Sequence, residues 1–447
     1  MQPKALPGFR DFYPAELALR AHIFRTWRCV AARYGFEEYD GPPLEPLELY
    51  TAKSGEEIVG QLYTFVDKGG REVALRPEMT PTLARMVAAR ANGLRKPIRW
   101  FSIPQLFRYE RQQRGRLREH FQLNCDLIGE PGPLGDAEII ALAVDAARAF
   151  GLGPEDIRLR ISDRRLLTAL LRALELDERQ SALVYQVLDK LARVPREVSV
   201  GRLREAGIGQ PTIDRLLGLT GAGTWERLRD EAGGLGAALT AGEPLSRTIE
   251  ALGAMGLGGF VDLDLTIVRG LAYYTGTVFE LFDAKGELRA ICGGGRFDDL
   301  LGALGGVELP ALGFGMGDVV LGELLRDRGL APAEPASIDV FLAAVTADDL
   351  PHLLALAHEL RAAGFRAEYA LSVQAVGKQL NLADARGARV AILIGPDDRA
   401  RGEVMVKDLA ARSQTAVALE LVRPKVAEIL GHGLTGKTDR KESRWRM

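Results

Sequence analysis

The sequence predicts an α+β protein with a large mixed core, a helical segment inserted into that core, and a small α/β domain at the C-terminal end. Three observations predict this organisation. Strand-like and helix-like segments alternate from residue 1 to about 160. Leu, Ala, Arg and Glu then recur at helical spacing over about 164–250. Alternation of strand and helix restarts at Ile338 and continues for about 90 residues, as in a mostly parallel sheet.

The composition is that of a globular protein with more than one core. The chain has 447 residues, 47% of them hydrophobic and 26% charged, which suggests roughly two to four domains. Its 58 Lys and Arg balance 60 Asp and Glu, for a net charge of −2. A nucleic-acid partner is neither demanded nor excluded, because a polyanion would need only a local basic face.

Cysteine usage indicates a reducing compartment. Cys29, Cys125 and Cys292 are far apart, with no CxxC pair and no His at ligand spacing, so we predict neither a disulfide framework nor a metal site. The N-terminal MQPKALPGFRDFYP lacks the apolar segment of a signal peptide. No apolar run reaches the roughly 18 to 20 residues of a membrane span. We therefore expect a cytoplasmic protein.

The first part of the chain contains several recognisable elements. AELALRAHIFRTWRCVAARYG predicts an amphipathic helix that ends at Gly35, and the prolines of GPPLEPLELY prevent its continuation. LYTFVDKGGREVALR predicts a hairpin that turns at Lys68-Gly69-Gly70. PTLARMVAARA predicts a helix. IRWFSIPQLFRYER and REHFQLNCDLIGE predict two long strands joined by the loop QQRGRL.

The remaining segments complete the predicted domain plan. The strand pattern returns at Val261 and runs to about Leu325, where the linker LAPAEPAS begins shortly afterwards. The tail GHGLTGKTDRKESRWRM is polar and basic, which predicts disorder. The expected boundaries are 1–163 and 256–330 for the two parts of the core, 164–255 for the helical insertion, 337–425 for the α/β domain and 430–447 for the tail.

A first candidate site is LRPEMTPTLARM. Arg76, Glu78 and Thr80 alternate at the end of a predicted strand, so their side chains share one face. A carboxylate beside a hydroxyl suits a primary ammonium group. The same pattern is also typical of an exposed strand end that leads into a helix begun by proline.

A second candidate is FRYERQQRGRLREHFQLNCD. Its arginines suit phosphate oxygens, because the guanidinium fork offers several donors in fixed geometry; they are Arg108, Arg111, Arg114, Arg116 and Arg118. Glu110 follows Arg108 by two residues, and Gln122 and Asp126 share one strand face amid apolar neighbours. A solvated hairpin would explain the arginines but not these polar residues. His120 is an ordinary packed residue or a base-stacking one.

Two further segments carry unusual residues. RGLAYYTGTVFE follows the strand-like VDLDLTIV and sets Arg269 beside the paired Tyr273 and Tyr274. CGGGRFDDLL places three glycines before Arg296, which lets backbone approach a ligand closely, although a plain strand-to-helix turn would also use them. GFGMGDVV is a second Gly-rich turn into a helix. Neither is a dinucleotide or P-loop motif.

The order of these motifs resembles the histidyl-tRNA synthetase family of class II aminoacyl-tRNA synthetases. The resemblance rests on LRPE, FRYER with its basic loop, RGLxYYTGTVFE, GGGRFDDLL, and a small domain with KQL and GEVMVKDL, and it spans nearly the whole chain. It implies a class II catalytic core with an antiparallel sheet flanked by helices, a helical insertion and a C-terminal α/β anticodon-binding domain. It also implies activation of L-histidine with ATP and transfer to tRNA(His).

The resemblance implies roles for individual residues. Arg269 and Arg108 would be catalytic, as cations at the α-phosphate. The histidine-binding residues would be Glu78, Met79, Thr80, Arg108, Gln122, Asp126, Arg269, Tyr273 and Tyr274. The ATP-binding residues would be Arg108, Glu110, Arg116, His120 and Arg296. ATP is expected with Mg²⁺, because charge on the phosphoryl oxygens is what needs stabilising.

The resemblance also implies partners. The family is dimeric, and here the interface would involve the segment that ends at Pro42-Pro43. Lys378, Gln379 and Arg389 are candidate tRNA-binding residues in the C-terminal domain, although a solvated helix face is the better explanation for each residue taken alone.

Two departures from the family pattern stand out. Ala272 replaces the aspartate of the usual RGLDYY, and GMGDVVLGELL has Asp318 and Val319 where the third class II motif carries Glu and an ATP-binding Arg. Either ATP is held by other arginines, such as Arg114, Arg116 or Arg296, or activity is reduced. The alternative function is that of a non-catalytic paralogue, a regulatory subunit of ATP phosphoribosyltransferase in histidine biosynthesis. Such chains lack the anticodon-binding domain.

Overall fold

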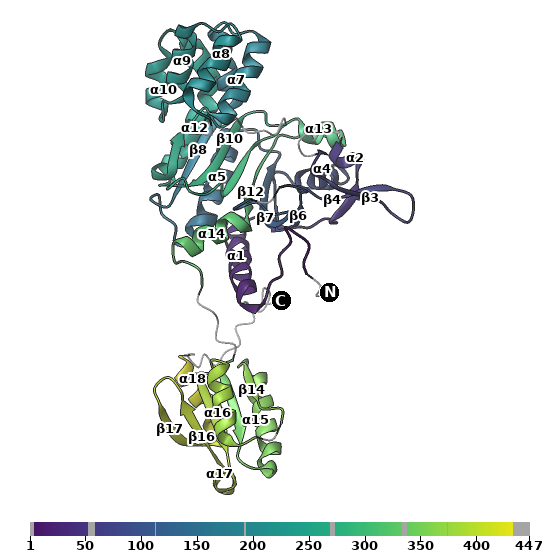
Figure 1. Ribbon diagram of the computed structural model, residues 1–447, viewed down its shortest axis with the longest axis vertical. Coiled ribbons are helices and arrows are strands. Elements are labelled where there is room, and N and C mark those ends of the chain that lie inside the picture. The colour runs from purple at the N-terminus through teal and green to yellow at the C-terminus, as the bar shows by residue number, and fades with distance from the viewer. Residues whose placement is uncertain are drawn as a thin grey trace. The chain divides into compact units, whose positions relative to one another are not determined.

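The computed structural model describes residues 4–51, 59–111, 113–191, 194–268, 273–332, 338–372 and 374–431. The chain divides into two compact units, Met1–Pro332 and Ala333–Met447 (Figure 1). Arg269 and Ala272 lie outside the described residues, as does most of the polar tail. Within the described residues, the first unit is built on a nine-stranded sheet and the second on a five-stranded sheet.

The large sheet of the first unit is mostly antiparallel, as the predicted fold class requires. Its strand order is β1-β5-β7-β12-β11-β10-β8-β9, and β6 pairs with β7. Only β1 with β5 and β8 with β9 run parallel within it. The strands are β1 (Glu37–Glu38), β5 (Ile98–Ser102), β6 (Gln105–Phe107), β7 (Glu119–Ile128), β8 (Ile157–Asp163), β9 (Val261–Leu263), β10 (Thr277–Asp283), β11 (Cys292–Arg296) and β12 (Ala311–Gly317).

Helices cover one face of this sheet and form the main core with it. They are α1 (Pro14–Arg33), α5 (Pro133–Arg148), α12 (Glu243–Ala254) and α14 (Asp318–Asp327). The predicted first helix is confirmed: it buries Ile23, Trp27 and Val30 at helical spacing. Gly35 follows it with φ +74°, a conformation that glycine adopts without a Cβ penalty, and so ends the helix.

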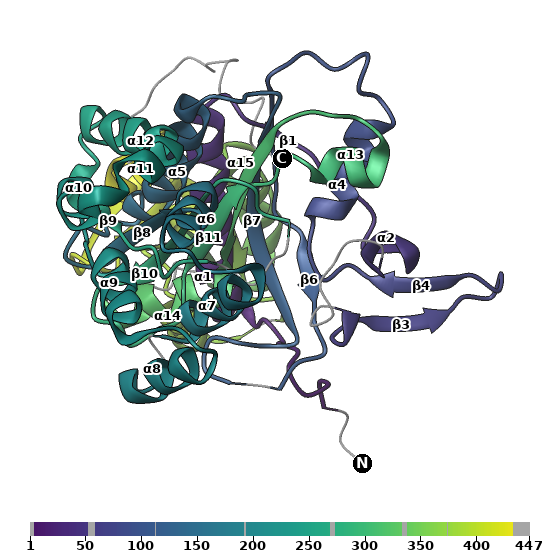
Figure 2. The same ribbon diagram turned by 90° about the horizontal axis from the view of Figure 1, so that it is seen from above.

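A smaller sheet stands beside the large one, with strand order β2-β4-β3. It consists of β2 (Leu44–Pro46), β3 (Tyr63–Val66) and β4 (Glu72–Leu75), next to α2 (Glu48–Thr51). The predicted hairpin at Lys68-Gly69-Gly70 is confirmed by the antiparallel pairing of β3 with β4. Figure 2 shows this hairpin projecting from the body of the unit. Behind it, α4 (Thr80–Ala88) packs on α13 (Leu300–Gly305).

The inserted segment is helical, as its composition predicts. It contains α6 (Arg164–Ala173), α7 (Glu178–Lys190), α8 (Arg196–Glu205), α9 (Gln210–Thr220), α10 (Trp225–Ala232), α11 (Gly236–Leu239) and then α12. Leu167, Val184, Val187 and Leu216 belong to a separate apolar cluster that holds α6 to α9 together, whereas α10, α11 and α12 pack in the main core. In Figure 1, α7 to α10 gather beyond α12 and β8, at one end of the first unit.

The second unit has its own core around the sheet β14-β13-β15-β16-β17. Its strands are β13 (Val340–Ala344), β14 (Ala367–Tyr369), β15 (Val390–Ile394), β16 (Glu403–Asp408) and β17 (Ser413–Ala418). Its helices are α15 (Leu350–Ala362), α16 (Val376–Ala385), α17 (Pro396–Arg401) and α18 (Val422–Leu430). The pairings of β13 with β14 and β15 are parallel, and the other two are antiparallel.

The structure corrects three local predictions. β6 ends at Phe107, so Arg108 and Glu110 lie in the loop that follows and not on a long strand. The expected strand VDLDLTIV is reduced to Val261–Leu263. The three glycines of CGGGRFDDLL form the middle of β11 instead of a turn. Among the described residues, no helix is long and apolar enough to cross a membrane.

Candidate active site

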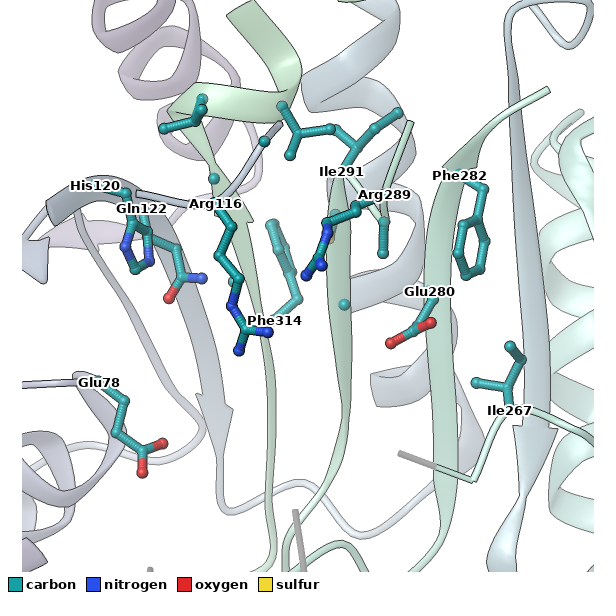
Figure 3. Close-up of a pocket in the computed structure, with 18 of the residues that line it drawn as sticks. Glu78, Arg116, His120, Gln122, Ile267, Glu280, Phe282, Arg289, Ile291 and Phe314 are labelled. Carbon is teal, nitrogen blue, oxygen red and sulfur yellow. The ribbon is translucent and has the colours of Figure 1, made fainter. Parts of the chain in front are cut away.

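A cavity of about 840 Å³ opens on the face of the large sheet opposite the main helical core. Side chains and backbone from β7, β10, β11 and β12 line it, together with the basic loop 108–118, the turn before α4 and the first turn of α14. Figure 3 shows Gln122, Arg116, Arg289 and Glu280 arranged across it. Most motifs that the sequence singles out therefore meet in one place.

The strand register explains why the floor of the cavity is open. Glu280 on β10 pairs with Gly293 on β11, Gly293 pairs with Gly315 on β12, and Gly315 pairs with Asn124 on β7. This row of paired residues across four strands therefore has side chains only at its two ends. Paired residues share a face of the sheet, and the faces alternate along each strand. The next row on the same face likewise runs from Val278 through two glycines to Asp126.

Two of these glycines make room for polar side chains of β7. A Cβ on Gly313 would lie 2.2 Å from Oδ1 of Asp126, and a Cβ on Gly315 would lie 2.5 Å from Cδ of Gln122. Any larger residue would therefore push the Asp126 or Gln122 side chain out of place. The Gly-rich stretch GFGMG is a strand whose missing side chains shape the cavity.

The paired tyrosines form a wall of the cavity and contact the turn before α4. Their rings lie 5.1 Å apart at an angle of 52°. The Tyr273 hydroxyl donates to Oε2 of Glu78 at 3.2 Å, which joins the tyrosine segment to LRPEMT. Tyr274 is buried, and its ring packs with the apolar cluster around α4 and α13. Thr80 also lines the cavity.

Asp126 is a buried carboxyl group at the floor of the cavity. Burial raises its pKa to about 8, since the charged form loses hydration that no described cation replaces. At neutral pH the carboxyl group is therefore mostly protonated. It can both donate and accept a hydrogen bond, which suits an imidazole ring with one donor and one acceptor nitrogen.

The basic loop contributes two arginines to the cavity. Arg108 Nε donates to the carbonyl of Pro77 at 3.0 Å, and Arg116 Nη2 donates to Oε1 of Glu110 at 2.7 Å. All three ionic side chains line the cavity together with His120. Desolvation, with the positive charges of Arg108, Arg10 and Arg116, lowers the pKa of His120 to about 3, so this ring is neutral at physiological pH.

The start of α14 presents valines to the cavity. Val319 and Val320 line it, whereas the buried Asp318 does not. Asp318 instead accepts a hydrogen bond from the backbone N–H of Phe121 at 2.8 Å, and it forms an ion pair with Arg10 at 2.9 Å. This carboxylate therefore ties the N-terminal segment and β7 to the helix.

Not all predicted residues reach the cavity. Arg296, expected to bind ATP, does not line it: its guanidinium is buried against Asp136 on α5 at 2.9 Å and Asp298 at 3.2 Å. Met79 is buried under the turn and is also not among the lining residues. Arg269, expected to be catalytic, lies outside the described residues.

The structure also brings in charged residues that the motifs did not single out as ligands, among them Glu280 and Arg289. Glu280 is the last residue of RGLAYYTGTVFE and lies on the cavity face of β10. Residues two apart on a strand face the same side, so Glu280 points to the same side as Val278. Arg289, in the connection between β10 and β11, lies in no recognisable motif.

The candidate tRNA-binding residues lie on or near α16 in the second unit. Lys378 and Arg389 are exposed. Gln379 is buried, and its Nε2 donates to the carbonyls of Ala344 and Gln374, both at 2.8 Å. Its amide therefore holds α16 to β13, which corrects the expectation that it is available to a partner.

Comparisons with known proteins agree with this architecture. The histidyl-tRNA synthetase family model matches residues 8–318, and an anticodon binding domain model matches residues 339–429. The chain is 48% identical over 433 residues to a histidine–tRNA ligase of Opitutus terrae, covering 95% of this chain and 98% of that one. It is 40% identical over 426 residues to a histidine–tRNA ligase of Leptospira biflexa, with 95% and 97% covered.

Solved structures give the same result. A histidyl-tRNA synthetase from Nostoc sp. PCC 7120 superposes with a TM-score of 0.83 at 26% identity, over 96% of this chain and 99% of that one. Family match, full-length identity and fold therefore coincide with the motifs that line the cavity. This chain belongs to the histidyl-tRNA synthetase family.

Proposed function

We propose that this chain is a histidine–tRNA ligase whose cavity makes histidyl-adenylate. One observation carries the proposal: a single cavity combines polar groups suited to a small zwitterion with arginines suited to phosphates, over a floor of glycine. The carboxylate of histidine would attack the α-phosphorus of ATP, and pyrophosphate would leave. The 3′-terminal hydroxyl of tRNA(His) would then attack the acyl carbon and release AMP.

Histidine would bind at the tyrosine side of the cavity. Asp126 and Tyr274 would hydrogen-bond the imidazole, while Glu78, Thr80 and Gln122 would take the α-amino group. The contact between Tyr273 and Glu78 supports this arrangement because it fixes the carboxylate at the cavity wall. Discrimination follows from burial, since a side chain without matching hydrogen bonds would leave Asp126 unpaired.

ATP would bind at the arginine side. Arg108 and Arg116 would contact phosphate oxygens, with Glu110 holding Arg116 in place and His120 serving as a neutral neighbour. Arg269 would be the fixed cation at the α-phosphate, a role that rests on its place in RGLAYY. No side chain has to act as nucleophile, so positioning and charge supply the catalysis.

Mg²⁺ would accompany ATP. The ion usually takes one or two protein carboxylates and receives its other ligands from phosphates and water. Glu280 fits this requirement, because its carboxylate points into the cavity (Figure 3). The ion would offset negative charge on the phosphates.

The second unit would bind the anticodon of tRNA(His), with Lys378 and Arg389 as candidate contacts. This proposal is supported by the anticodon-domain match and by the exposure of both side chains. A homodimer formed through the segment that ends at Pro42-Pro43, and a cytoplasmic location, complete the proposal by analogy with the family.

The test is ATP–pyrophosphate exchange, scanned over the amino acids. We expect exchange with histidine alone, and we expect Arg269→Ala to lose most of the rate while its thermal unfolding stays cooperative. A folded protein that shows no exchange with any amino acid would contradict catalysis. Binding to an ATP phosphoribosyltransferase would then be measured, as the alternative function requires.

A further inference from the structure

The wall of the cavity at the start of α14 lacks a positive charge of its own. Val319 and Val320 are the lining residues there, and Asp318 is committed to Arg10 and to the backbone of Phe121. A bound triphosphate brings several negative charges, which need cations or Mg²⁺ nearby. Another part of the chain must therefore supply a cation at this wall.

Two of the arginines expected to compensate are occupied elsewhere. Arg114 pairs with Glu323 at 3.4 Å and Asp327 at 3.2 Å on α14, and it does not line the cavity. Arg296 is buried in its contacts with Asp136 and Asp298 on the far face of β11. Arg116 lines the cavity but is already paired with Glu110.

Arg289 is placed to act at this wall. A Cβ on Gly115 would lie 3.2 Å from Val320 Cγ2 and 4.0 Å from Arg289 Cδ, so the arginine stem and the α14 wall meet at the same point of the basic loop. Figure 3 shows the guanidinium groups of Arg289 and Arg116 pointing into one space, between Gln122 and Glu280.

The guanidinium of Arg289 is also chemically available. Its side chain is exposed, and the group that holds it is the neutral amide of Gln113 and not a carboxylate. Its Nη2 donates to Oε1 of Gln113, which orients the side chain along the basic loop and leaves its other donors for a ligand. A charged fork held by a neutral amide is well suited to phosphate oxygens.

We propose that Arg289 binds the triphosphate of ATP, in place of an arginine at the start of α14. The proposal rests on the function proposed above and adds a residue to its nucleotide site. Arg289 would face the distal phosphates together with Arg116, on the side of the cavity away from the tyrosines.

The test compares ATP affinity across variants, by calorimetric titration of ATP without histidine and by KM for ATP in pyrophosphate exchange. Arg289→Ala should weaken ATP binding about 10- to 100-fold, the loss expected for a hydrogen-bonded charge contact. Histidine affinity should stay unchanged, which also shows that the variant is folded. Arg289→Lys should recover part of the loss, because the ammonium keeps the charge without the fork.

Matched controls separate ligand binding from a structural role. Arg114→Ala removes an exposed arginine of the neighbouring basic loop that does not line the cavity, and it should leave ATP affinity unchanged. Gln113→Ala removes only the tether of Arg289 and should have a much smaller effect than Arg289→Ala. The proposal is overturned if Arg289→Ala binds ATP normally, if Gln113→Ala is equally severe, or if Arg289→Lys is no better than Arg289→Ala.

The two measurements distinguish a failure of this assignment from a failure of the proposed function. If the unmodified protein shows no histidine-dependent exchange, the ligase proposal fails, yet the titration still reports whether Arg289 binds ATP. If exchange is normal in both the unmodified protein and Arg289→Ala, only the assignment of Arg289 fails.

Discussion

Asp126 illustrates how a single residue is set by its surroundings. Its position on β7 is fixed by pairing with Gly313 and Trp100 on the two neighbouring strands. Burial between them raises the pKa of the carboxyl group to about 8, far above the value of about 3.9 in an unfolded chain. The folded protein therefore keeps a proton here that the unfolded protein releases in mild acid.

This proton predicts a pH dependence of stability. Because the folded-state pKa is raised, the stabilising contribution is complete below about pH 4 and is lost as pH rises towards 8, at up to about 1.4 kcal/mol per pH unit. Asp126→Asn cannot ionise, so its unfolding free energy should improve relative to the unmodified protein between pH 5 and pH 8. Urea denaturation at both pH values measures this, and parallel pH profiles would contradict the assignment.

At the scale of elements, β11 and β12 act as a floor without side chains. Gly293 and Gly295 on β11 face the same side as Gly313 and Gly315 on β12, and the opposite side of both strands packs in the main core. On that opposite side β12 carries the apolar Leu312, Phe314 and Met316, whereas the cavity side of both strands is bare backbone. That backbone can approach a ligand closely.

Two alanine substitutions on β12 should differ in their cost. Gly313→Ala meets the carbonyl oxygen of Cys125 at 2.7 Å as well as the Asp126 carboxyl, and backbone cannot move aside. We expect it to lower the unfolding free energy by about 1–3 kcal/mol. For Gly315→Ala the nearest atoms all belong to the end of the Gln122 side chain, which can move, so this change should cost less stability while weakening histidine binding. Equal losses of stability in urea titrations would contradict this account.

At the scale of the whole molecule, each unit has its own apolar core. All residues that line the cavity belong to Met1–Pro332, and the anticodon-domain match lies entirely within Ala333–Met447. Adenylate formation and anticodon binding are thus assigned to different units. The shared tRNA would couple the two steps.

A chain that ends at Pro332 should therefore separate the two steps. Histidine-dependent pyrophosphate exchange should stay close to that of the full chain. Aminoacylation of tRNA(His), measured as kcat/KM, should fall by about 100-fold or more, as when one of two linked binding modules is removed. Cooperative thermal unfolding of the shortened chain is the control. A folded short chain that has lost exchange would show that the second unit is needed for the cavity.

Much of the fold and chemistry could be predicted from local sequence. Gly35 ends the first helix and Gly69-Gly70 turns the hairpin, because these effects depend on the backbone of a few neighbouring residues. The motifs also pointed to Glu78, Gln122 and Arg116, all of which line one cavity.

The tertiary structure decided the rest, because it sets which face of a strand looks towards the ligand. Arg296 directly follows a glycine that faces the cavity, so strand alternation turns it to the other face, against Asp136. Arg289 belongs to no recognisable motif. It lines the cavity because the connection between β10 and β11 packs near Gly115 and Val320. The sequence by itself determined the family and the chemical groups, whereas long-range strand pairing determined which of those groups meet.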